Sequence, residues 1–259
     1  MVFKYAFIIS SLLFLVLMGW WLFFRKKKLV NRNFPLNWQQ ILDEKVLFYN
    51  RLTPAEKVRF EQAILQFLDN VAITGVEINI DDTDRLLVAA SAVIPLFGFP
   101  GWQYRNLNEV LLYKGLFNQD YATEGGDRHT LGMVGSGAMQ RMMILSRPAL
   151  HQSFENQQSN RNVGIHEFVH LLDKADGSVD GIPEVLIQKQ FTIPWLKRMH
   201  QEIKDIKEQH SDIDPYGATS EAEFLSVVSE YFFNNPQQFE KKHPELFALL
   251  EKIYHQNLT

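Results

Sequence analysis

The stretch that most constrains this chain is a short apolar segment with two histidines, G-I-H-E-F-V-H-L-L-D at residues 164–173. His166 and His170 are four residues apart, so on an α-helix they lie on one face, one turn from each other. Almost all of the other side chains in the segment are apolar, which predicts a buried helix. Buried polar side chains need a partner, and a metal ion bound by both imidazoles would supply one.

Glu167 directly follows the first histidine and completes the H-E-x-x-H pattern that is typical of zinc metallopeptidases. In such a site the ion activates a water molecule, and the glutamate accepts a proton from it as the general base. The alternative is a core helix whose histidines are satisfied by ordinary hydrogen bonds. The chain has no cysteine, which excludes thiolate metal sites, disulfides and a cysteine nucleophile. We therefore predict one zinc ion per chain, held by histidine, carboxylate and water.

A second feature is a run of twenty residues without a charged side chain, Tyr5–Phe24. As a helix it would span about 30 Å, the thickness of the hydrocarbon core of a bilayer. Trp20 and Trp21 lie near its end, and four basic residues follow at 25–28, as expected at a membrane interface. A cleaved signal peptide would need a more basic start, a shorter apolar core and small residues before the cut, none of which is present.

Because only Lys4 precedes this run and four basic residues follow it, the positive-inside rule places the remainder of the chain in the cytoplasm. The expected organisation is a membrane anchor with its basic flank at residues 1–28, a tether at 29–37 and one catalytic domain at 38–259.

The net charge of −4 conceals an uneven distribution of charge. Six basic residues precede Asp43, the first acidic residue, which leaves 20 of the 26 basic residues against all 30 acidic ones. A domain with this balance is a poor candidate for nonspecific nucleic-acid binding. We therefore predict no nucleic-acid partner.

Local patterns predict an α+β domain, with a small mixed sheet against the metal helix and further helices around it. The strands are expected at residues 76–80, 109–113 and 141–146, the last two separated by a glycine-rich loop. The helices are expected at residues 38–50, from a capping box at 53–56 onward, at 86–96, 193–209, 220–234 and 236–256. The strand before the metal helix, Met142–Leu145, is interpreted as a sheet edge. It either pairs with the backbone of an extended peptide or is an ordinary edge.

Catalytic zinc usually has three protein ligands, so a third is needed besides the two histidines. A thermolysin-like pattern would place a glutamate twenty residues after the second histidine, where this chain has Gln190. A metzincin pattern would place glycine and histidine three and six residues after it, where this chain has Asp173 and Asp176. Both patterns fail, although Asp176 could itself bind the metal.

Two further candidates, Glu223 and Glu230, are seven residues apart and share a largely apolar face of the later helix. Carboxylates on such a face usually bind something. An equally good interpretation of Glu223 is a capping box with Ser220, three residues earlier. Spacing alone leaves this choice open.

Five motifs together make a family resemblance specific. They are F-P-G-W at 99–102, H-E-F-V-H-L-L-D at 166–173, D-G-I-P at 180–183, D-P-Y-G-A-T-S-E-A-E-F at 214–224 and S-E-Y-F-F at 229–233. With them, the chain resembles the Mlc titration factor A family over most of residues 55–245. These are bacterial zinc metallopeptidases whose catalytic core is similar to that of anthrax lethal factor, so the resemblance implies a zincin-like fold.

The resemblance also implies roles for particular residues. His166, His170 and Glu223 would bind zinc, and Glu167 would be the base. Tyr216 would lie over the metal, where its hydroxyl could stabilise an oxyanion; the alternative is a loop tyrosine that packs on the core.

Two acids remain as candidates for supporting roles. Asp173 could hold a ligand imidazole by its free N–H or could cap the end of the helix, and Glu230 is a weaker candidate for the same support.

The family is known for aminopeptidase-like activity and for sequestering a transcriptional repressor of sugar uptake. This leaves two function classes, a peptidase acting on peptides or proteins and a regulatory binding protein whose hydrolysis is secondary. A binding protein has no need of Glu167, so the intact motif favours the peptidase. The well-known members are soluble cytosolic proteins. The predicted anchor departs from them and implies a single-pass protein of the bacterial inner (cytoplasmic) membrane with its catalytic domain in the cytoplasm.

Overall fold

A computed structural model of the chain describes residues 33–116, 131–135, 140–156 and 159–259. The predicted anchor, Tyr5–Phe24, lies outside these residues. Among the residues described, no helix is both long and apolar enough to cross a bilayer. One packed unit runs from Phe34 to Thr259. Phe34 is buried and the first helix of this unit begins at Leu36, so the last residues of the predicted tether belong to this unit.

Four short strands form one mixed sheet in the order β1-β2-β4-β3. The strands are β1 Ala72–Val76, β2 Glu109–Tyr113, β3 Gly132–Val134 and β4 Met142–Ser146. β1, β2 and β4 are parallel, whereas β3 runs antiparallel to β4 and is the last strand in the order. Side chains of β2 alternate between two faces, because Val110 and Leu112 enter the main core while Leu111 and Tyr113 belong to a smaller cluster.

The prediction of a strand at residues 76–80 is wrong, since only the first of these residues belongs to β1. The chain turns back at Glu77, which has a positive φ of 58°. Ile78 and Ile80 then pack against the core, which accounts for the alternation that suggested a strand. Gly75 permits this return, because a Cβ there would lie 2.3 Å from the carbonyl oxygen of Ile78.

The prediction that Met142–Leu145 is a sheet edge is also wrong. β4 lies between β2 and β3, so both of its sides are paired. The strand at the edge is β3, within the glycine-rich stretch predicted to be a loop. Three residues are too few to show an alternating pattern, so no periodic signal marks this strand.

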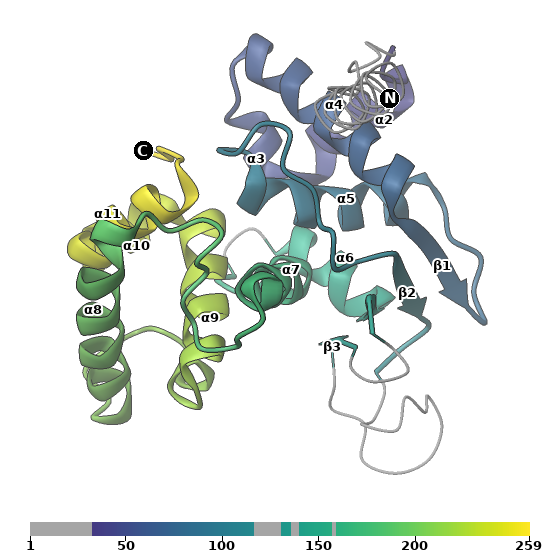
Figure 1. The fold of residues 1–259 in the computed structure, drawn as a ribbon. Helices are drawn as coiled ribbons and strands as arrows, with labels where there is room; N and C mark the ends of the chain where they lie inside the picture. Colours follow the sequence, from purple (N-terminus) through teal and green to yellow (C-terminus); the bar gives the residue numbers. More distant parts are fainter. Residues whose placement is uncertain (1–32, 117–130, 136–139, 157–158) are drawn as a thin grey trace, which may run out of the picture. The chain divides into compact units, whose positions relative to one another are not determined.

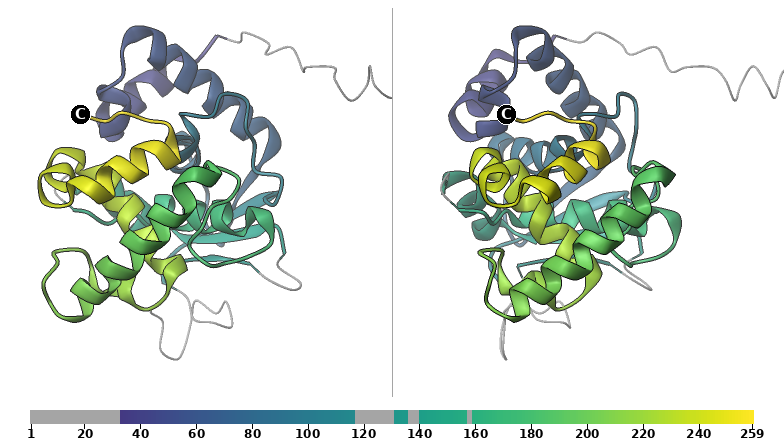
Figure 2. Two further views of the ribbon diagram at one scale, coloured as in Figure 1. Left: turned by 60° about the vertical axis from the view of Figure 1, so that its left-hand side comes forward. Right: turned by 90° about the vertical axis from the view of Figure 1, so that its left-hand side faces the viewer.

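Helices surround α7, the predicted metal helix, on both sides (Figures 1 and 2). The α-helices are α2 Leu36–Lys45, α3 Leu47–Asn50, α4 Pro54–Asn70, α5 Asp82–Leu96, α6 Arg147–Glu155, α7 Val163–Asp173, α8 Lys189–Lys207, α9 Glu221–Asn234, α10 Pro236–Lys242 and α11 Pro244–Tyr254. The part of the chain that the structure describes also has two short 3-10 helices, η2 Lys174–Asp176 and η3 Pro215–Ala218. The helix predicted at 38–50 is divided at Val46, and the one predicted at 236–256 is divided at His243.

Helix α7 packs against α5 on one side and α9 on the other. α5 begins with a capping box between Asp81 and Asp84 and is buried along almost its whole length. α4 begins with the predicted capping box between Thr53 and Glu56, which is confirmed. On the far side of α9, helices α8 and α11 lie side by side (Figure 2).

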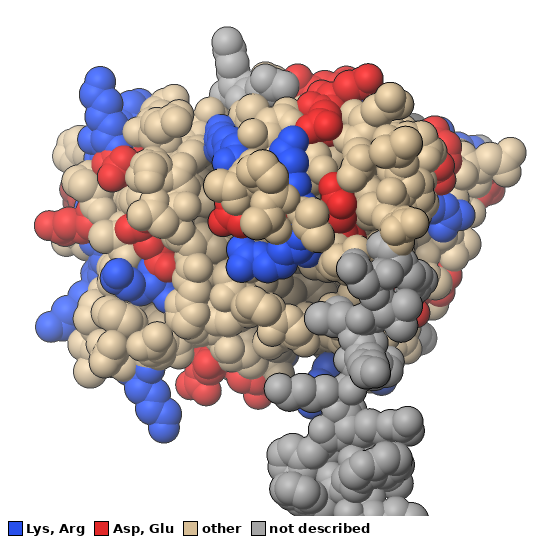
Figure 3. Space-filling view, turned by 90° about the horizontal axis from the view of Figure 1, so that it is seen from above, with Lys and Arg blue, Asp and Glu red and all other residues tan. Residues whose placement is uncertain are grey.

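Charged side chains of both signs are interspersed on the face shown in Figure 3. Such a mixture gives no extended field of one sign over that face. Ion pairs also join the helices. Lys57 of α4 lies 2.6 Å from Asp43 of α2, and Arg147 at the start of α6 lies 2.8 Å from the buried Asp84 of α5.

The crossing of α7 and α5 generates a prediction about stability. A Cβ on Gly164 would lie 2.1 Å from Oγ and 2.7 Å from Cβ of Ser91, so the helices must move apart to admit it. We expect Gly164→Ala to lower the free energy of unfolding by about 1–3 kcal/mol, although alanine favours a helix over glycine by about 1 kcal/mol. Urea unfolding measures the change. Gly115→Ala is the control, because nothing lies within 4 Å of a Cβ there; equal stability of the two variants would contradict the packing argument.

Candidate metal centre

Three side chains of the ligand type converge between α7 and α9. His166 and His170 project from α7, and Glu223 reaches them from the first turn of α9. The Nε2 atoms of the two histidines are 3.1 Å apart. Oε2 of Glu223 lies 3.0 Å from Nε2 of His166 and 3.3 Å from Nε2 of His170. The three side chains keep between 13% and 22% of their surface exposed, so an ion can reach them from solvent.

The separations between these atoms fit a metal ion. In a tetrahedral zinc site with bonds of about 2.0–2.1 Å, neighbouring ligand atoms lie about 3.3 Å apart. The separations of 3.0, 3.1 and 3.3 Å are close to this value. Two imidazole nitrogens and a carboxylate oxygen repel one another at such distances unless a cation or a proton lies among them.

The outer nitrogens of the imidazoles also have partners. Nδ1 of His166 lies 2.7 Å from Oε1 of Glu230, and Nδ1 of His170 lies 3.3 Å from Oγ of Ser226. We infer that His166 donates from Nδ1 to the carboxylate, which leaves the lone pair of Nε2 facing the cluster. Burial lowers the pKa of His166, but Glu230 and Glu223 outweigh it and raise this pKa well above its usual value. The cluster therefore attracts positive charge.

Glu230, the weaker of the two supporting candidates, is the acid that contacts a ligand-type imidazole. Its other carboxylate oxygen accepts a hydrogen bond from the backbone N–H of Asn162, at the start of α7. Asp173 instead accepts from the backbone N–H of Gly181 at 3.0 Å, so it holds the loop that follows the helix. The contact of Ser226 was not predicted, although Ser226 lies three residues after Glu223 on the same face of α9.

The other two candidates for the third position have different contacts. Both carboxylate oxygens of Asp176 accept hydrogen bonds within its own loop, from Ser178 and from the backbone of Glu184. Asp176 is therefore not part of the cluster. Oγ of Ser220 accepts from the backbone N–H of Glu223 at 3.2 Å and caps α9. The Glu223 side chain turns to the histidines, so the reciprocal half of the predicted capping box is not made.

Glu167 lies beside the cluster with only 6% of its surface exposed. Its side chain packs against β3, where a Cβ on Gly132 would lie 2.6 Å from Cγ of Glu167. Burial raises the pKa of Glu167; the histidines lower it, while Glu223 and Glu230 raise it further. A carboxylate with a raised pKa is a more effective base near neutral pH than an ordinary one.

Tyr216, in η3, lies over one imidazole. Its ring centroid is 6.0 Å from that of His166, and the residue is 52% exposed. Burial of the hydroxyl and the nearby carboxylate of Glu223 raise the pKa of Tyr216 to about 12. The hydroxyl therefore stays protonated at neutral pH and can donate a hydrogen bond.

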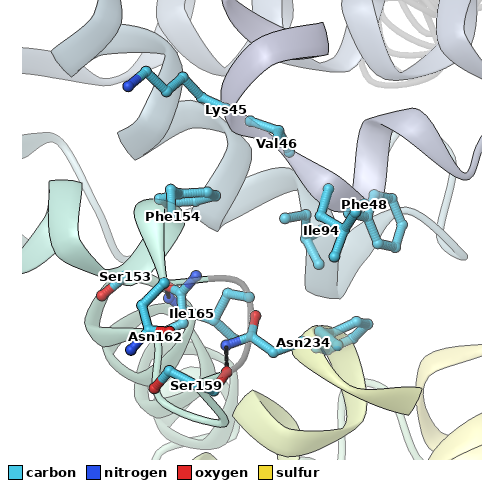
Figure 4. Close-up of a pocket in the computed structure, with 13 residues that line it drawn as sticks. Lys45, Val46, Phe48, Ile94, Ser153, Phe154, Ser159, Asn162, Ile165 and Asn234 are labelled. Atoms are coloured by element: carbon cyan, nitrogen blue, oxygen red, sulfur yellow. Dashed lines mark hydrogen bonds between the residues drawn. The ribbon is translucent and has the colours of Figure 1, made fainter. Parts of the chain in front are cut away.

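A separate pocket lies at the N-terminal end of α7, and none of the predicted site residues lines it (Figure 4). Its polar lining includes Asn162, Ser159 and Asn234, and Asn234 donates to the carbonyl oxygen of Ser159 at 3.3 Å. These contacts join the segment before α7 to the end of α9. We interpret the residues that line this pocket as structural, because they hold the N-terminal end of α7 against the C-terminal end of α9.

Comparison with known proteins decides the family. The family model for glucose-regulated metallo-peptidase M90 matches residues 20–255. The chain belongs to this family.

Similarity to individual proteins supports the same family assignment. An uncharacterized protein of Synechocystis sp. is 30% identical over 266 residues, 96% of each chain. A protein of Escherichia fergusonii named Mlc titration factor A is 30% identical over 241 residues, 87% of this chain and 88% of its own. A protein of the same name from Pectobacterium atrosepticum is 28% identical over 191 residues, 70% of this chain and 71% of its own. The predicted resemblance is confirmed.

A metallopeptidase of this family implies a metal ion. Within the described ranges, His166, His170 and Glu223 form the one group of three His, Asp or Glu side chains found with converging ligand atoms. The assignment of these three as ligands, of Glu167 as base and of Tyr216 as donor stays a prediction.

The contact of Glu230 generates a prediction about metal affinity. We expect Glu230→Gln to weaken metal binding by about 10–100-fold, because His166 loses the charged acceptor that orients it. Titration against a chelator of known affinity measures the change, and unfolding of the same samples shows whether the fold is kept. The control is Glu221→Gln on the same helix, since the Glu221 side chain is 50% exposed and pairs with His200 instead. Equal affinities of the two variants would contradict the role of Glu230.

Proposed function

We propose that this protein is a zinc-dependent peptidase of the aminopeptidase-like kind, which hydrolyses peptide bonds in a peptide or protein substrate. One observation carries the proposal. His166, His170 and Glu223 converge at separations of 3.0–3.3 Å, with the buried Glu167 beside them. Membership of a metallopeptidase family supports the reaction class.

The mechanism follows from the positions of these side chains. Zinc held by His166, His170 and Glu223 would lower the pKa of a water molecule towards neutrality. Glu167 accepts the proton as this water attacks the peptide carbonyl, and then delivers it to the leaving amine. Tyr216 donates its hydroxyl to the carbonyl oxygen as that oxygen gains negative charge.

The experiment that tests this proposal compares the full chain with Glu167→Gln. The substrates are a panel of peptides with free or acetylated N-termini, and the zinc content of each sample is determined. We expect the variant to lose at least about 100-fold in activity, the usual contribution of a general base, while its zinc content is unchanged. Loss of zinc in the variant would instead make Glu167 structural, and a zinc-loaded wild type that cleaves no peptide would contradict the proposal. Cleavage that requires a free N-terminus would establish the aminopeptidase specificity.

A second candidate function is a regulatory binding protein that sequesters a transcriptional repressor of sugar uptake. It is favoured by the name of relatives that are 28–30% identical, Mlc titration factor A, which describes those proteins as titrating Mlc. Glu167→Gln separates the two functions. Binding of the repressor should survive this substitution, whereas hydrolysis should not.

We further propose that the chain is a single-pass protein of the bacterial inner (cytoplasmic) membrane, with residues 34–259 in the cytoplasm. The support is the uncharged run Tyr5–Phe24 with basic residues at 25–28. We expect the full chain to resist carbonate extraction, and Leu15→Arg to release it, because arginine near the middle of a span costs about 2.5–3.5 kcal/mol. Wild-type protein in the carbonate supernatant would rule out the anchor.

A further inference from the structure

Strand β3 and helix α7 run side by side in the same direction. At one end, Gly132 lies against Glu167, as the 2.6 Å from a Cβ on Gly132 to Cγ of Glu167 indicates. At the other end, Nζ of Lys174 donates to the carbonyl oxygen of Gly135, the residue after β3, at 3.4 Å. Three residues of strand span about 10 Å, and seven residues of helix rise about 10.5 Å. The strand and the helix therefore advance by the same length between the two contacts, as expected when they run parallel.

Lys174 continues the face of α7 that carries the two histidines. It follows His166 by eight residues and His170 by four, and its backbone is still in the helical region with φ −69° and ψ −7°. Its side chain therefore lies on the same side of the helix as the metal cluster, towards the end of β3.

Among the residues that the structure describes, no carboxylate forms an ion pair with Lys174. Its neighbour Asp173 accepts a hydrogen bond from the backbone N–H of Gly181, and Asp176 accepts from Ser178 and from the backbone N–H of Glu184. The bond of Lys174 to a neutral carbonyl at 3.4 Å is long. An ammonium group has three donors, so a partly buried lysine with this single partner keeps donors for an anion.

We propose that Lys174 binds a carboxylate of the substrate, so that the enzyme prefers peptides with an anionic group about three residues from the scissile bond. The inference rests on the proposed peptidase function. An extended peptide beside β3 advances about 3.3 Å per residue, so the roughly 10 Å from Glu167 to Lys174 corresponds to about three residues. The carboxylate is either an acidic side chain or the free C-terminus of a short peptide.

The charge of Lys174 makes this contact selective. Lys174 supplies a positive charge one helical turn beyond His170. An anionic group is therefore favoured at that end of α7.

The test uses the zinc-loaded full chain and the best substrate found in the peptide panel. Glu, Gln and Lys are placed in turn at each position up to four residues on either side of the scissile bond, and a free C-terminus is compared with an amidated one. The proteins are wild type, Lys174→Met, Lys174→Arg and Lys174→Glu, with zinc content and unfolding temperature measured for each. Lys252→Glu is the control, because Lys252 is an exposed residue of α11.

We expect wild type to prefer Glu over Gln, or the free C-terminus over the amide, by about tenfold in kcat/KM through KM, as for a charge-assisted hydrogen bond at a partly exposed site. The preference should persist in Lys174→Arg and Lys252→Glu, vanish in Lys174→Met and change to a preference for Lys in Lys174→Glu. A preference for Glu identifies the side chain as the source, and a preference for the free acid identifies the C-terminus.

Three results would overturn the inference. A wild type that cleaves its substrates with no preference at any position, or a preference that survives in Lys174→Met, refutes the role of Lys174 and leaves the peptidase function standing. A zinc-loaded wild type that cleaves no peptide refutes the peptidase function itself, and the role of Lys174 with it.

Discussion

The meeting of three electron-rich ligand atoms between α7 and α9 is the constraint on which the rest of the site depends. Two imidazole nitrogens and a carboxylate oxygen lie 3.0–3.3 Å from one another, where only positive charge makes them compatible. The helices that carry them must therefore be held in place by other contacts. α5 supplies these on one side, because Gly164 lets it approach α7 closely, and Glu230 supplies them on the other by joining His166 to the N-terminal end of α7.

Helix α9 contributes to the cluster through three polar side chains that lie on one face of a largely buried helix. Glu223, Ser226 and Glu230 follow one another at intervals of three and four residues, the spacing of one helix face. The first faces the cluster, and the other two contact the outer nitrogens of the imidazoles. Because an outer acceptor fixes both the tautomer and the orientation of an imidazole, this stripe defines which lone pairs face the metal position.

Periodic and local signals in the sequence predicted much of this arrangement. His166 and His170 share one face of α7, and Glu223 and Glu230 share one face of α9, as their spacing predicted. Residue spacing determines which side chains share a face of a helix, so these predictions needed no tertiary information. Spacing alone left Glu223, Glu230 and Asp176 as alternatives, since the choice depends on how α9 and the loop after α7 approach the histidines. The edge strand β3 was missed for a similar reason, because its pairing with β4 is a tertiary contact made by only three residues. The alternation at 76–80 was misleading because Glu77 turns the chain back.

The alignment of β3 with α7 links the direction of the substrate to the type of peptidase. An aminopeptidase holds a single residue on the amino side of the scissile bond, so any group about three residues away must lie on the carboxyl side. If the enzyme is an aminopeptidase, the carboxyl side of its substrate must therefore run from Glu167 towards Lys174, in the direction of β3 itself. An endopeptidase has no such restriction, and a substrate that paired antiparallel to β3 would bring its amino side to Lys174. The side of the scissile bond on which an acid is preferred therefore bears on both the direction of the substrate and the class of the enzyme.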